Sequence, residues 1–324
     1  MPKKPSLRAR GESKVSHHWG YVAILFSAVL FGVSTAINKM LLESFSPLMI
    51  ASVTYIVAGL FLGAVTLLPK KAGLVTWLKL PTSTAKTEPT RKDVILLMLT
   101  ALIGGVLAPA LYMMGLNNTS AVSTALLGNT EALFTIAIAF IFLGERGRTK
   151  DYGAMALLIF GAVILTTNLN FQQFSALGTF LGNVLVVLSC FCWGIDNSLA
   201  RVLTVKGSVL KVGSLKGIIG GGLLFAAISL YGMRISSSPQ SIVLLVLVGV
   251  FSVGFSLLLF LFSLQQIGAM KTSVIFATAS LFGAVSAFFV LHEPISLLQA
   301  LAGVLMLIAI YVLAIPKKES TNTG

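Results

Sequence analysis

Charged residues are scarce in this sequence. They make up 10% of the 324 residues, whereas hydrophobic residues make up 56%. Soluble domains carry about 25% charged residues. Five long runs contain no Asp, Glu, Lys or Arg at all: 47–68, 94–116, 241–264, 272–291 and 295–315. Each is close to the ~20 residues that a helix needs to cross the hydrocarbon core of a bilayer. The composition therefore excludes a soluble domain and predicts an all-α polytopic membrane protein.

Residues that form metal sites or disulfides are also few. The two cysteines, Cys190 and Cys192, lie within an apolar run and are too close together for an ordinary disulfide, so we interpret them as small packing residues. His17, His18 and His292 are too scattered for a metal site. The phosphate-binding motif GxxxxGK[ST] is missing as well. We therefore expect no metal, no cofactor and no ATP-driven step.

The apolar runs and their breaks predict ten transmembrane helices. The basic N-terminal stretch is not followed by a small-residue cleavage pattern, so we expect the first helix to be retained rather than removed with a signal peptide. The spans are expected at 19–42, 47–68, 94–116, 120–143, 152–167, 178–200, 212–232, 241–264, 272–291 and 295–315.

The positions of the basic residues predict the orientation of these helices. The net charge is +13, and all 23 lysines and arginines except Lys39, Lys216 and Arg234 lie in the tails or in alternate connections. By the positive-inside rule, those segments are cytoplasmic. The expected location is the plasma (inner) membrane, with both termini in the cytoplasm. The basic excess is thus explained by the bilayer, and no nucleic-acid partner is expected.

Two internal matches predict a repeat. Residues 111–145 match residues 259–293 at eleven of 35 positions, and the first and sixth spans match at an offset of 162 residues, with Lys39 opposite Arg201. Because each half has five spans, the second half must enter the membrane from the opposite side, which gives an inverted repeat. The expected organisation is two five-helix repeats between two cytoplasmic tails: 1–18, 19–168 with a loop at 69–93, 177–315 and 316–324.

Short motifs add a family resemblance. Gly144-Glu145 ends the fourth span, His292-Glu293-Pro294 ends the ninth, and "WGIDNSLAR" in the sixth span is followed by "LKG" in the seventh. In these motifs the chain resembles the EamA-type branch of the drug/metabolite transporter superfamily. The resemblance covers nearly all of the chain outside the tails, and it implies ten helices in two inverted five-helix repeats. The sequence departs from the family in the fourth span, where Ala132 rather than proline follows Glu131.

Glu131 is the first candidate functional residue. It lies eleven residues from the start of its span and twelve from the end, close to the middle of the bilayer. An ionisable side chain at that depth usually faces a cavity or a partner, because exposure to lipid costs several kcal/mol. We expect Glu131 to line a cavity and to contact substrate or carry a proton, and Thr124 to lie on the same helix face. The alternative is a structural, hydrogen-bonded glutamate.

The first and sixth spans provide further candidates. Phe31, Ser34 and Asn38 form a stripe on the first span, and the repeat places Trp193 and Asp196 at the positions of Phe31 and Ser34. Aromatic rings beside small polar groups suit a cavity for an amphipathic solute. We therefore predict that these five residues, together with Asn197, bind substrate. For the serine alone, helix packing is the stronger interpretation.

Asp196 has a candidate partner in Lys216. The turn between the sixth and seventh spans centres near Gly207, which lies eleven residues after Asp196 and nine residues before Lys216. On antiparallel neighbours the two side chains would lie at similar depth and could pair. The pair would act as a tie between helices or as a gate, and the sequence leaves both open. Lys39 and Arg201, at helix ends, are expected to reach the interface as anchors, with a role at the cavity mouth.

These features favour a secondary transporter, most readily an exporter of small organic metabolites that works by alternating access. A gradient of the solute, of protons or another ion, or of a counter-solute would supply the energy, or a partner protein would. An intramembrane enzyme acting on a lipid-linked substrate and a passive channel are the alternatives. Neither the substrate, the direction of transport nor the oligomeric state follows from the sequence, although the glutamate at 131 favours solutes with a positive group.

Overall fold

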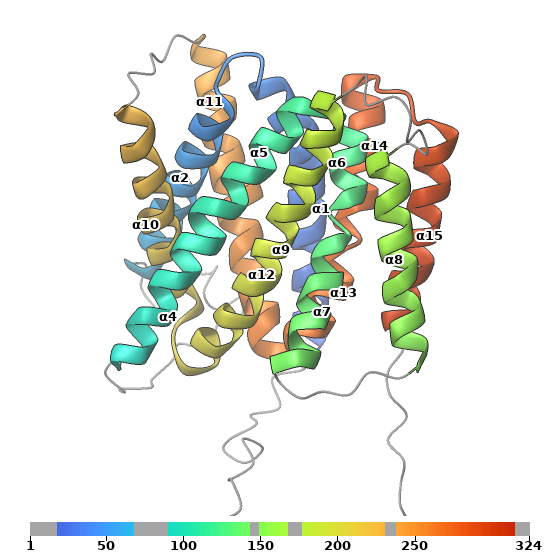
Figure 1. The fold of residues 1–324 in the computed structure, drawn as a ribbon. Coiled ribbons are helices and arrows are strands. Elements are labelled where there is room, and N and C mark those ends of the chain that lie inside the picture. The colour runs from blue at the N-terminus through green and yellow to red at the C-terminus, as the bar shows by residue number, and fades with distance from the viewer. Residues whose placement is uncertain (1–17, 68–89, 143–148, 168–176, 231–237, 315–324) are drawn as a thin grey trace, which may run out of the picture.

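The computed structural model describes residues 18–67, 90–142, 149–167, 177–230 and 238–314 (Figure 1). The tails predicted at 1–18 and 316–324 lie outside these residues except for His18, as do most of the loop at 69–93 and the Gly144-Glu145 motif. Every regular element among the described residues is a helix.

Most helices follow the predicted spans closely, but the sixth continues to Lys206 instead of ending at 200, so that Arg201 lies within the helix and not at its end. Nine described segments are long and apolar enough to cross a membrane, and Leu297–Leu313 is a shorter apolar helix in the position of the tenth span. The elements are α1 His18–Leu41, α2 Pro47–Leu67, α4 Arg91–Leu102, η1 Ile103–Leu107, α5 Ala108–Asn118, α6 Ala121–Leu127, α7 Thr130–Phe142, α8 Thr149–Thr167, α9 Leu177–Lys206, α10 Val209–Ser229, α11 Pro239–Leu247, η3 Val248–Phe255, α12 Ser256–Ile267, α13 Ala269–Phe276, α14 Ala279–Leu291 and α15 Leu297–Ala314.

Local chemistry explains where several helices begin and end. Thr90 and Asp93 form a capping box at the start of α4, in which each side chain accepts a hydrogen bond from the other's backbone N–H. Gly268 ends α12 with a φ of 87°, and His292 ends α14 in the left-handed region with a φ of 55°. Left-handed residues are common helix stops because they redirect the chain while satisfying terminal carbonyls.

The fourth span is not the continuous helix that we expected at 120–143. It is interrupted at residues 128–129, so that α7 begins one residue before Glu131. Here the backbone N–H of Glu131 bonds to the carbonyl of Gly128, a tighter spacing than in an α-helix. The ninth span is interrupted at the equivalent place, residues 277–278. Both breaks occur without proline, so apolar periodicity gave no sign of them.

The third and eighth spans each contain a wider turn. The π-helical segments Ile103–Leu107 and Val248–Phe255 lie in the middle of these spans. Such segments shift the register of a helix and often occur at functional sites. In the third span, Gly104 and Gly105 lie within this turn, and Pro109 follows it at the start of α5.

The packing of the helices has the two-fold symmetry of an inverted repeat. Helix α1 packs on α12 and α14, and α9, its equivalent in the second half, packs on α5 and α7. Helices α2 and α10 pack on each other, as do α8 and α15 (Figure 1). The symmetry extends to single atoms at two glycines. A Cβ added to Gly32 would lie 2.8 Å from Cβ of Phe282, and one added to Gly194 would lie 2.8 Å from Cβ of Phe134.

A compact apolar cluster fills one end of the helix bundle. We call it the α1–α12 cluster. It joins the first half of α1 to α12 and to the facing ends of α2, α9 and α10, and none of its buried members is more than 9% exposed. Its buried residues are Ala23, Ile24, Ala28, Leu62, Ala200, Val209, Leu258, Leu259, Phe260, Leu261, Phe262, Leu264, Phe276 and Ala279.

Candidate functional site

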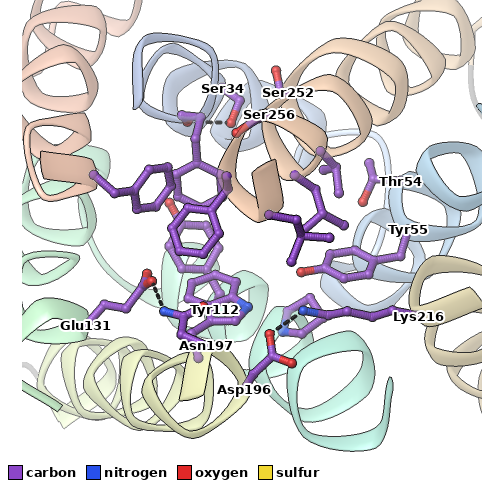
Figure 2. A pocket seen from close by; sticks show the side chains of 18 of the residues that line it. Ser34, Thr54, Tyr55, Tyr112, Glu131, Asp196, Asn197, Lys216, Ser252 and Ser256 are labelled. Atoms are coloured by element: carbon purple, nitrogen blue, oxygen red, sulfur yellow. Dashed lines mark hydrogen bonds and ion pairs between the residues drawn. The ribbon is translucent and has the colours of Figure 1, made fainter. Parts of the chain in front are cut away.

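A cavity of about 770 Å³, counting the part open to solvent, lies between the two halves of the bundle (Figure 2). Ligand pockets in proteins commonly have volumes of 300–1,000 Å³, apolar walls and a few polar groups. Both halves contribute to the walls, and α1, α2, α5, α7, α9, α10, η3, α12 and α13 all take part. The lining residues are Phe31, Ser34, Asn38, Thr54, Tyr55, Pro109, Tyr112, Met113, Glu131, Trp193, Asp196, Asn197, Lys216, Ser252, Val253, Ser256, Leu257, Phe260, Leu261 and Phe276.

The structure brings together most of the candidate residues from the sequence. Eight of them line this cavity: Phe31, Ser34, Asn38, Glu131, Trp193, Asp196, Asn197 and Lys216. Thr124 instead lines a smaller cavity of about 360 Å³, which shares Glu131, Trp193 and Phe31 with the larger one. Lys39 and Arg201 line neither. The grouping agrees with a shared site, but the substrate-binding role of each residue stays a prediction.

Glu131 is held by a neutral partner from the other half. Asn197 Nδ2 on α9 donates a 2.7 Å hydrogen bond to Glu131 Oε1 on α7, and the same nitrogen lies 3.4 Å from Thr135 Oγ1. Of the lysines and arginines that the structure describes, none forms an ion pair with Glu131. The glutamate is 7% exposed. Glu131 is therefore a buried acid that faces the cavity and has an amide, not a cation, as its partner.

Asp196 and Lys216 form a buried ion pair. Lys216 Nζ on α10 contacts Asp196 Oδ2 on α9, and the two side chains are 3% and 2% exposed. The carboxylate lies directly against the π-helical turn of the third span, because a Cβ on Gly104 would overlap it. The other oxygen, Asp196 Oδ1, has no hydrogen-bond partner among the residues that the structure describes. The pair is thus a contact among three spans, and whether it acts as a tie or a gate stays a prediction.

An aromatic wall occupies the middle of the cavity. The ring of Phe31 lies 5.8 Å from Trp193, 6.0 Å from Tyr112 and 5.3 Å from Phe276, measured between ring centroids. Tyr112 and Trp193 are 5.3 Å apart, and Phe260 and Phe276 are 4.9 Å apart. Rings at such distances, tilted or edge to face, attract each other beyond simple burial. The wall is built from both halves, and Figure 2 shows its Tyr112 between Glu131 and Lys216.

Several residues of this site could not be singled out from the sequence. Tyr55, Tyr112, Phe260 and Phe276 all line the cavity, yet aromatic residues within apolar runs do not stand out from the core. The internal repeat contains a signal for two of these residues. Tyr112 and Phe260 are partners at the offset of 148 residues, just as Phe31 and Trp193 are partners at 162. Two pairs of equivalent aromatic residues therefore surround the cavity.

Lys39 and Arg201 bind helix ends instead of facing the cavity. Lys39 Nζ donates to the carbonyls of Leu116 and Thr119, each at 2.7 Å, at the end of α5. Arg201 Nη1 donates to the carbonyl of Gln265 at 2.6 Å and to that of Leu264, at the end of α12. Positive charges are favourable at helix C-termini, where carbonyls lack partners. The predicted role of the two residues at a cavity mouth is not tested by these contacts.

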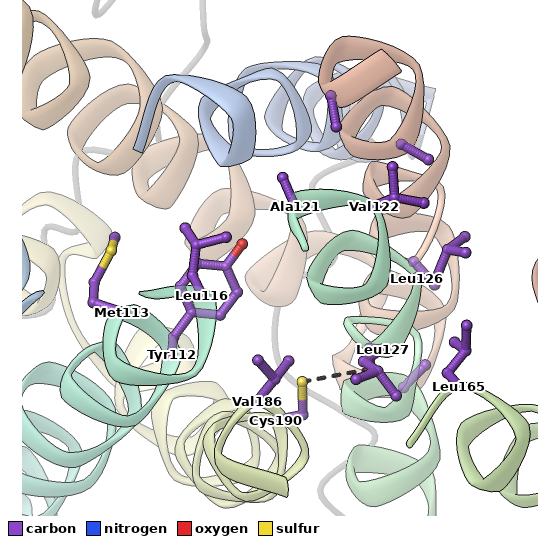
Figure 3. Packing of buried hydrophobic residues seen from close by; sticks show 14 of the residues in the cluster. Tyr112, Met113, Leu116, Ala121, Val122, Leu126, Leu127, Leu165, Val186 and Cys190 are labelled. Atoms are coloured by element: carbon purple, nitrogen blue, oxygen red, sulfur yellow. Dashed lines mark hydrogen bonds between the residues drawn. The ribbon is translucent and has the colours of Figure 1, made fainter. Parts of the chain in front are cut away.

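The cysteine at 190 is a packing residue. Cys190 is fully buried beside Leu127 and Val186, and its sulfur lies 3.8 Å from the carbonyl oxygen of Leu127 (Figure 3). Cys190 and Cys192 are both free thiols. Among the described residues, no group of three or more His, Cys, Asp or Glu is arranged to hold a metal ion. Cys190 thus helps to fill the space between α6 and α9 behind the cavity.

Comparison with known proteins identifies the family. The sequence model of the EamA-like transporter family matches residues 18–167 and again residues 180–315, once in each half. The chain belongs to the EamA-like transporter family. Two matches, one per half, agree with the internal repeat, and the family makes the protein a multi-pass membrane transporter. The repeat boundaries predicted at 168 and 177 stay predictions.

Several individual proteins are similar to this chain over most of their length. An uncharacterized transporter of Methanothermobacter thermautotrophicus is 32% identical over 295 residues, which cover 91% of this chain and 86% of the relative. An uncharacterized transporter of Archaeoglobus fulgidus is 24% identical over 69% of this chain and 77% of the relative. One crystal structure, 16% identical, superposes with a TM-score of 0.66 over 90% of this chain and 95% of that chain, which shows a shared fold.

Proposed function

We propose that this protein is a secondary transporter that exports small organic metabolites across the plasma (inner) membrane through the cavity described above. The observation that carries the proposal is a buried, partly polar cavity at the junction of two inverted repeats. Transporters built from inverted repeats bind their substrates at that junction, near the middle of the membrane. Glu131 is the central polar contact in this proposal, and Trp193 and Phe31 form its apolar wall.

The proposed mechanism is alternating access. With both termini in the cytoplasm, as the basic connections indicate, the start of α1 and the ends of α9 and α12 lie toward the cytoplasm. The α1–α12 cluster fills that end. Across it, Ser27 and Ser256 exchange hydrogen bonds between side chains and backbone at 2.8–3.1 Å. These contacts support a state that is closed toward the cytoplasm, and movement of the two halves would open it.

Coupling to a second solute would operate through the same cavity. A carboxyl group buried beside a neutral amide can hold a proton or a positive counter-solute, because either neutralises its charge in a region where charge is costly. Glu131 is in that position, and Asp196 is already neutralised by Lys216. We therefore propose Glu131 as the group through which a proton or counter-solute would be coupled to export.

Flux in sealed proteoliposomes tests the proposal. Vesicles would be loaded with a mixed pool of amino acids, polyamines, small amines and organic acids, a pH gradient would be imposed, and loss would be read by mass spectrometry. We expect selective loss of one chemical class with the wild type and at least a tenfold slower loss with Glu131→Gln.

A matched control separates the site from the change of charge. Glu43 is exposed outside the cavity, so Glu43→Gln removes the same charge and should transport like the wild type. If wild-type vesicles lose none of the chemical classes selectively, the transport function is contradicted. Equal loss with Glu131→Gln and wild type would contradict the assignment of the cavity as the passage.

A further inference from the structure

The charges within the cavity do not balance. Two carboxylic acids and one lysine line it: Glu131, Asp196 and Lys216. The lysine is committed to Asp196, so the pair contributes no net charge. Glu131 is left with a neutral amide as partner. When Glu131 is ionised, the cavity carries one net negative charge, and a bound cation is the ligand that neutralises it.

The unpaired polar atoms of the lining point to the same kind of ligand. Among the described lining residues, the buried side-chain atoms without a hydrogen-bond partner are Asn38 Oδ1 and Asp196 Oδ1. Both are acceptors. A buried acceptor costs free energy unless a donor reaches it. A ligand that brings N–H donors would satisfy these atoms, whereas a carboxylate or phosphate would bring only further acceptors.

The aromatic wall completes this match. The rings of Phe31, Tyr112 and Trp193 lie together in the cavity, with centroids 5.3–6.0 Å apart. The face of an aromatic ring attracts a cation, most strongly when the ring is tryptophan and the site excludes water. The same rings provide an apolar surface for the body of a ligand. The wall therefore accepts both an ammonium group and the hydrocarbon attached to it.

We propose that the cavity takes an amphipathic organic ammonium ion, with its charged nitrogen at Glu131 and its apolar body against the aromatic wall. The inference rests on the proposed function, since it names the substrate class of the same cavity. A zwitterion could enter only if its carboxylate displaced Asp196 from Lys216, which would leave an uncompensated buried carboxylate. An anion would face the net charge of Glu131 directly. The ammonium ion needs neither rearrangement.

A series of ligands that share one hydrocarbon body and differ in charge tests which charge the cavity prefers. The full-length protein in lipid nanodiscs would be titrated by calorimetry at pH 7.5 with phenethylammonium, 2-phenylethanol, phenylalanine and phenylacetate. These probes share a benzene ring on a short chain and are cationic, neutral, zwitterionic and anionic in turn. We expect phenethylammonium to bind at least tenfold more tightly than the alcohol, and the alcohol more tightly than phenylacetate. Tighter binding of phenylalanine or phenylacetate than of phenethylammonium would overturn the inference.

Variants of Glu131 identify where the charge binds. Glu131→Gln keeps an oxygen acceptor for the Asn197 amide. We expect it to lower the affinity for phenethylammonium at least tenfold and to change the affinity for 2-phenylethanol less than twofold. Glu131→Asp restores the charge and should recover most of the affinity, which a misfolded variant would not. Glu43→Gln should match the wild type. Unchanged ammonium binding in Glu131→Gln, or no saturable binding of phenethylammonium to the wild type, would overturn the inference. Selective flux of another class from the mixed pool would then leave the transport function standing.

Discussion

Lys39 and Arg201 make equivalent contacts in the two halves of the protein. They are partners at the repeat offset of 162 residues, and each donates to the last carbonyls of a neighbouring helix. The acceptors are equivalent too, since Leu116 and Leu264 are partners at the offset of 148. The same contact therefore occurs at two opposite ends of the bundle: a long basic side chain on one span caps the C-terminus of another span.

Removing either cation should destabilise the protein. Lys39→Met and Arg201→Met keep most of the aliphatic stem but leave helix carbonyls without a donor, and a hydrogen bond to a charged group contributes about 1.5–3 kcal/mol. We expect each variant to lower the free energy of unfolding by ~1–3 kcal/mol in mixed micelles. Lys211→Met, at an exposed position on α10, should change it by less than ~0.5 kcal/mol. Equal stability of all three variants would show that the caps contribute nothing.

The Asp196–Lys216 pair should matter most when only one partner is lost. Asp196→Asn or Lys216→Met leaves one buried charge without its counter-ion, which costs about 3–5 kcal/mol. The double variant removes both charges and should recover most of that loss. Unfolding of the four proteins in a double-mutant cycle checks this. If the losses of unfolding free energy in the two single variants simply add up in the double variant, the two side chains do not interact.

The same double variant distinguishes a tie from a gate. If the pair only joins α9 to α10, the double variant should still prefer phenethylammonium to 2-phenylethanol and should still transport, because Glu131 provides the negative charge of the cavity and the asparagine keeps an oxygen acceptor. We expect this result. Recovered stability without recovered transport would instead show that the pair opens and closes during the cycle.

Gly104 should tolerate no side chain. A Cβ at this position in the π-helical turn would overlap the Asp196 carboxyl group, so Gly104→Ala must displace the acid or the helix. We expect a loss of about 1–3 kcal/mol, typical of overpacking. Gly222→Ala is the matched control, because nothing lies within 4 Å of a Cβ there and alanine favours the helix by roughly 0.5–1 kcal/mol. If both variants melt at the same temperature, the close contact at Gly104 is not a constraint.

Much of the fold could be predicted because the bilayer restricts it. Ten apolar segments, their order and the inverted repeat follow from run length and internal matches, since only helices with internal hydrogen bonds can cross the hydrocarbon core. The contact of Asp196 with Lys216 followed from simple hairpin spacing. The interruptions before Glu131 and after Phe276 did not, because neither contains proline and apolar residues continue the predicted span on both sides of each.

The site was harder to predict than the fold because it depends on lateral packing. The bond between Asn197 and Glu131 requires α9 to lie beside α7, and nothing in either segment specifies that neighbour. Only part of the aromatic wall could be predicted from the sequence. Phe31 and Trp193 stood out because polar residues accompany them, whereas Tyr112 and Phe260 lie among residues of similar hydropathy. Tyr112 and Phe260 are nevertheless aromatic at equivalent positions of the repeat, and this pairing is a sequence signal for both.

A disulfide across the proposed cytoplasmic closure should stop transport. The hydroxyl oxygens of Ser27 and Ser256 are 2.9 Å apart, so Ser27→Cys with Ser256→Cys, in a background where Cys190 and Cys192 are alanine, places two thiols in contact. We expect oxidation to reduce flux at least tenfold and reductant to restore it. Each single-cysteine variant is the control. Full flux in the oxidised double variant would mean that α1 and α12 do not separate during the cycle.

The most direct test of the account is whether one cavity residue is reached from both sides of the membrane. Ser34 lines the cavity on α1, and Ser34→Cys in the cysteine-free background can be labelled with a membrane-impermeant thiol reagent in right-side-out and inside-out vesicles. Alternating access predicts labelling from both sides, and it predicts that labelling from the cytoplasmic side is lost when positions 27 and 256 are joined by a disulfide. Labelling from one side only, whether or not that disulfide is formed, would contradict alternating access through this cavity.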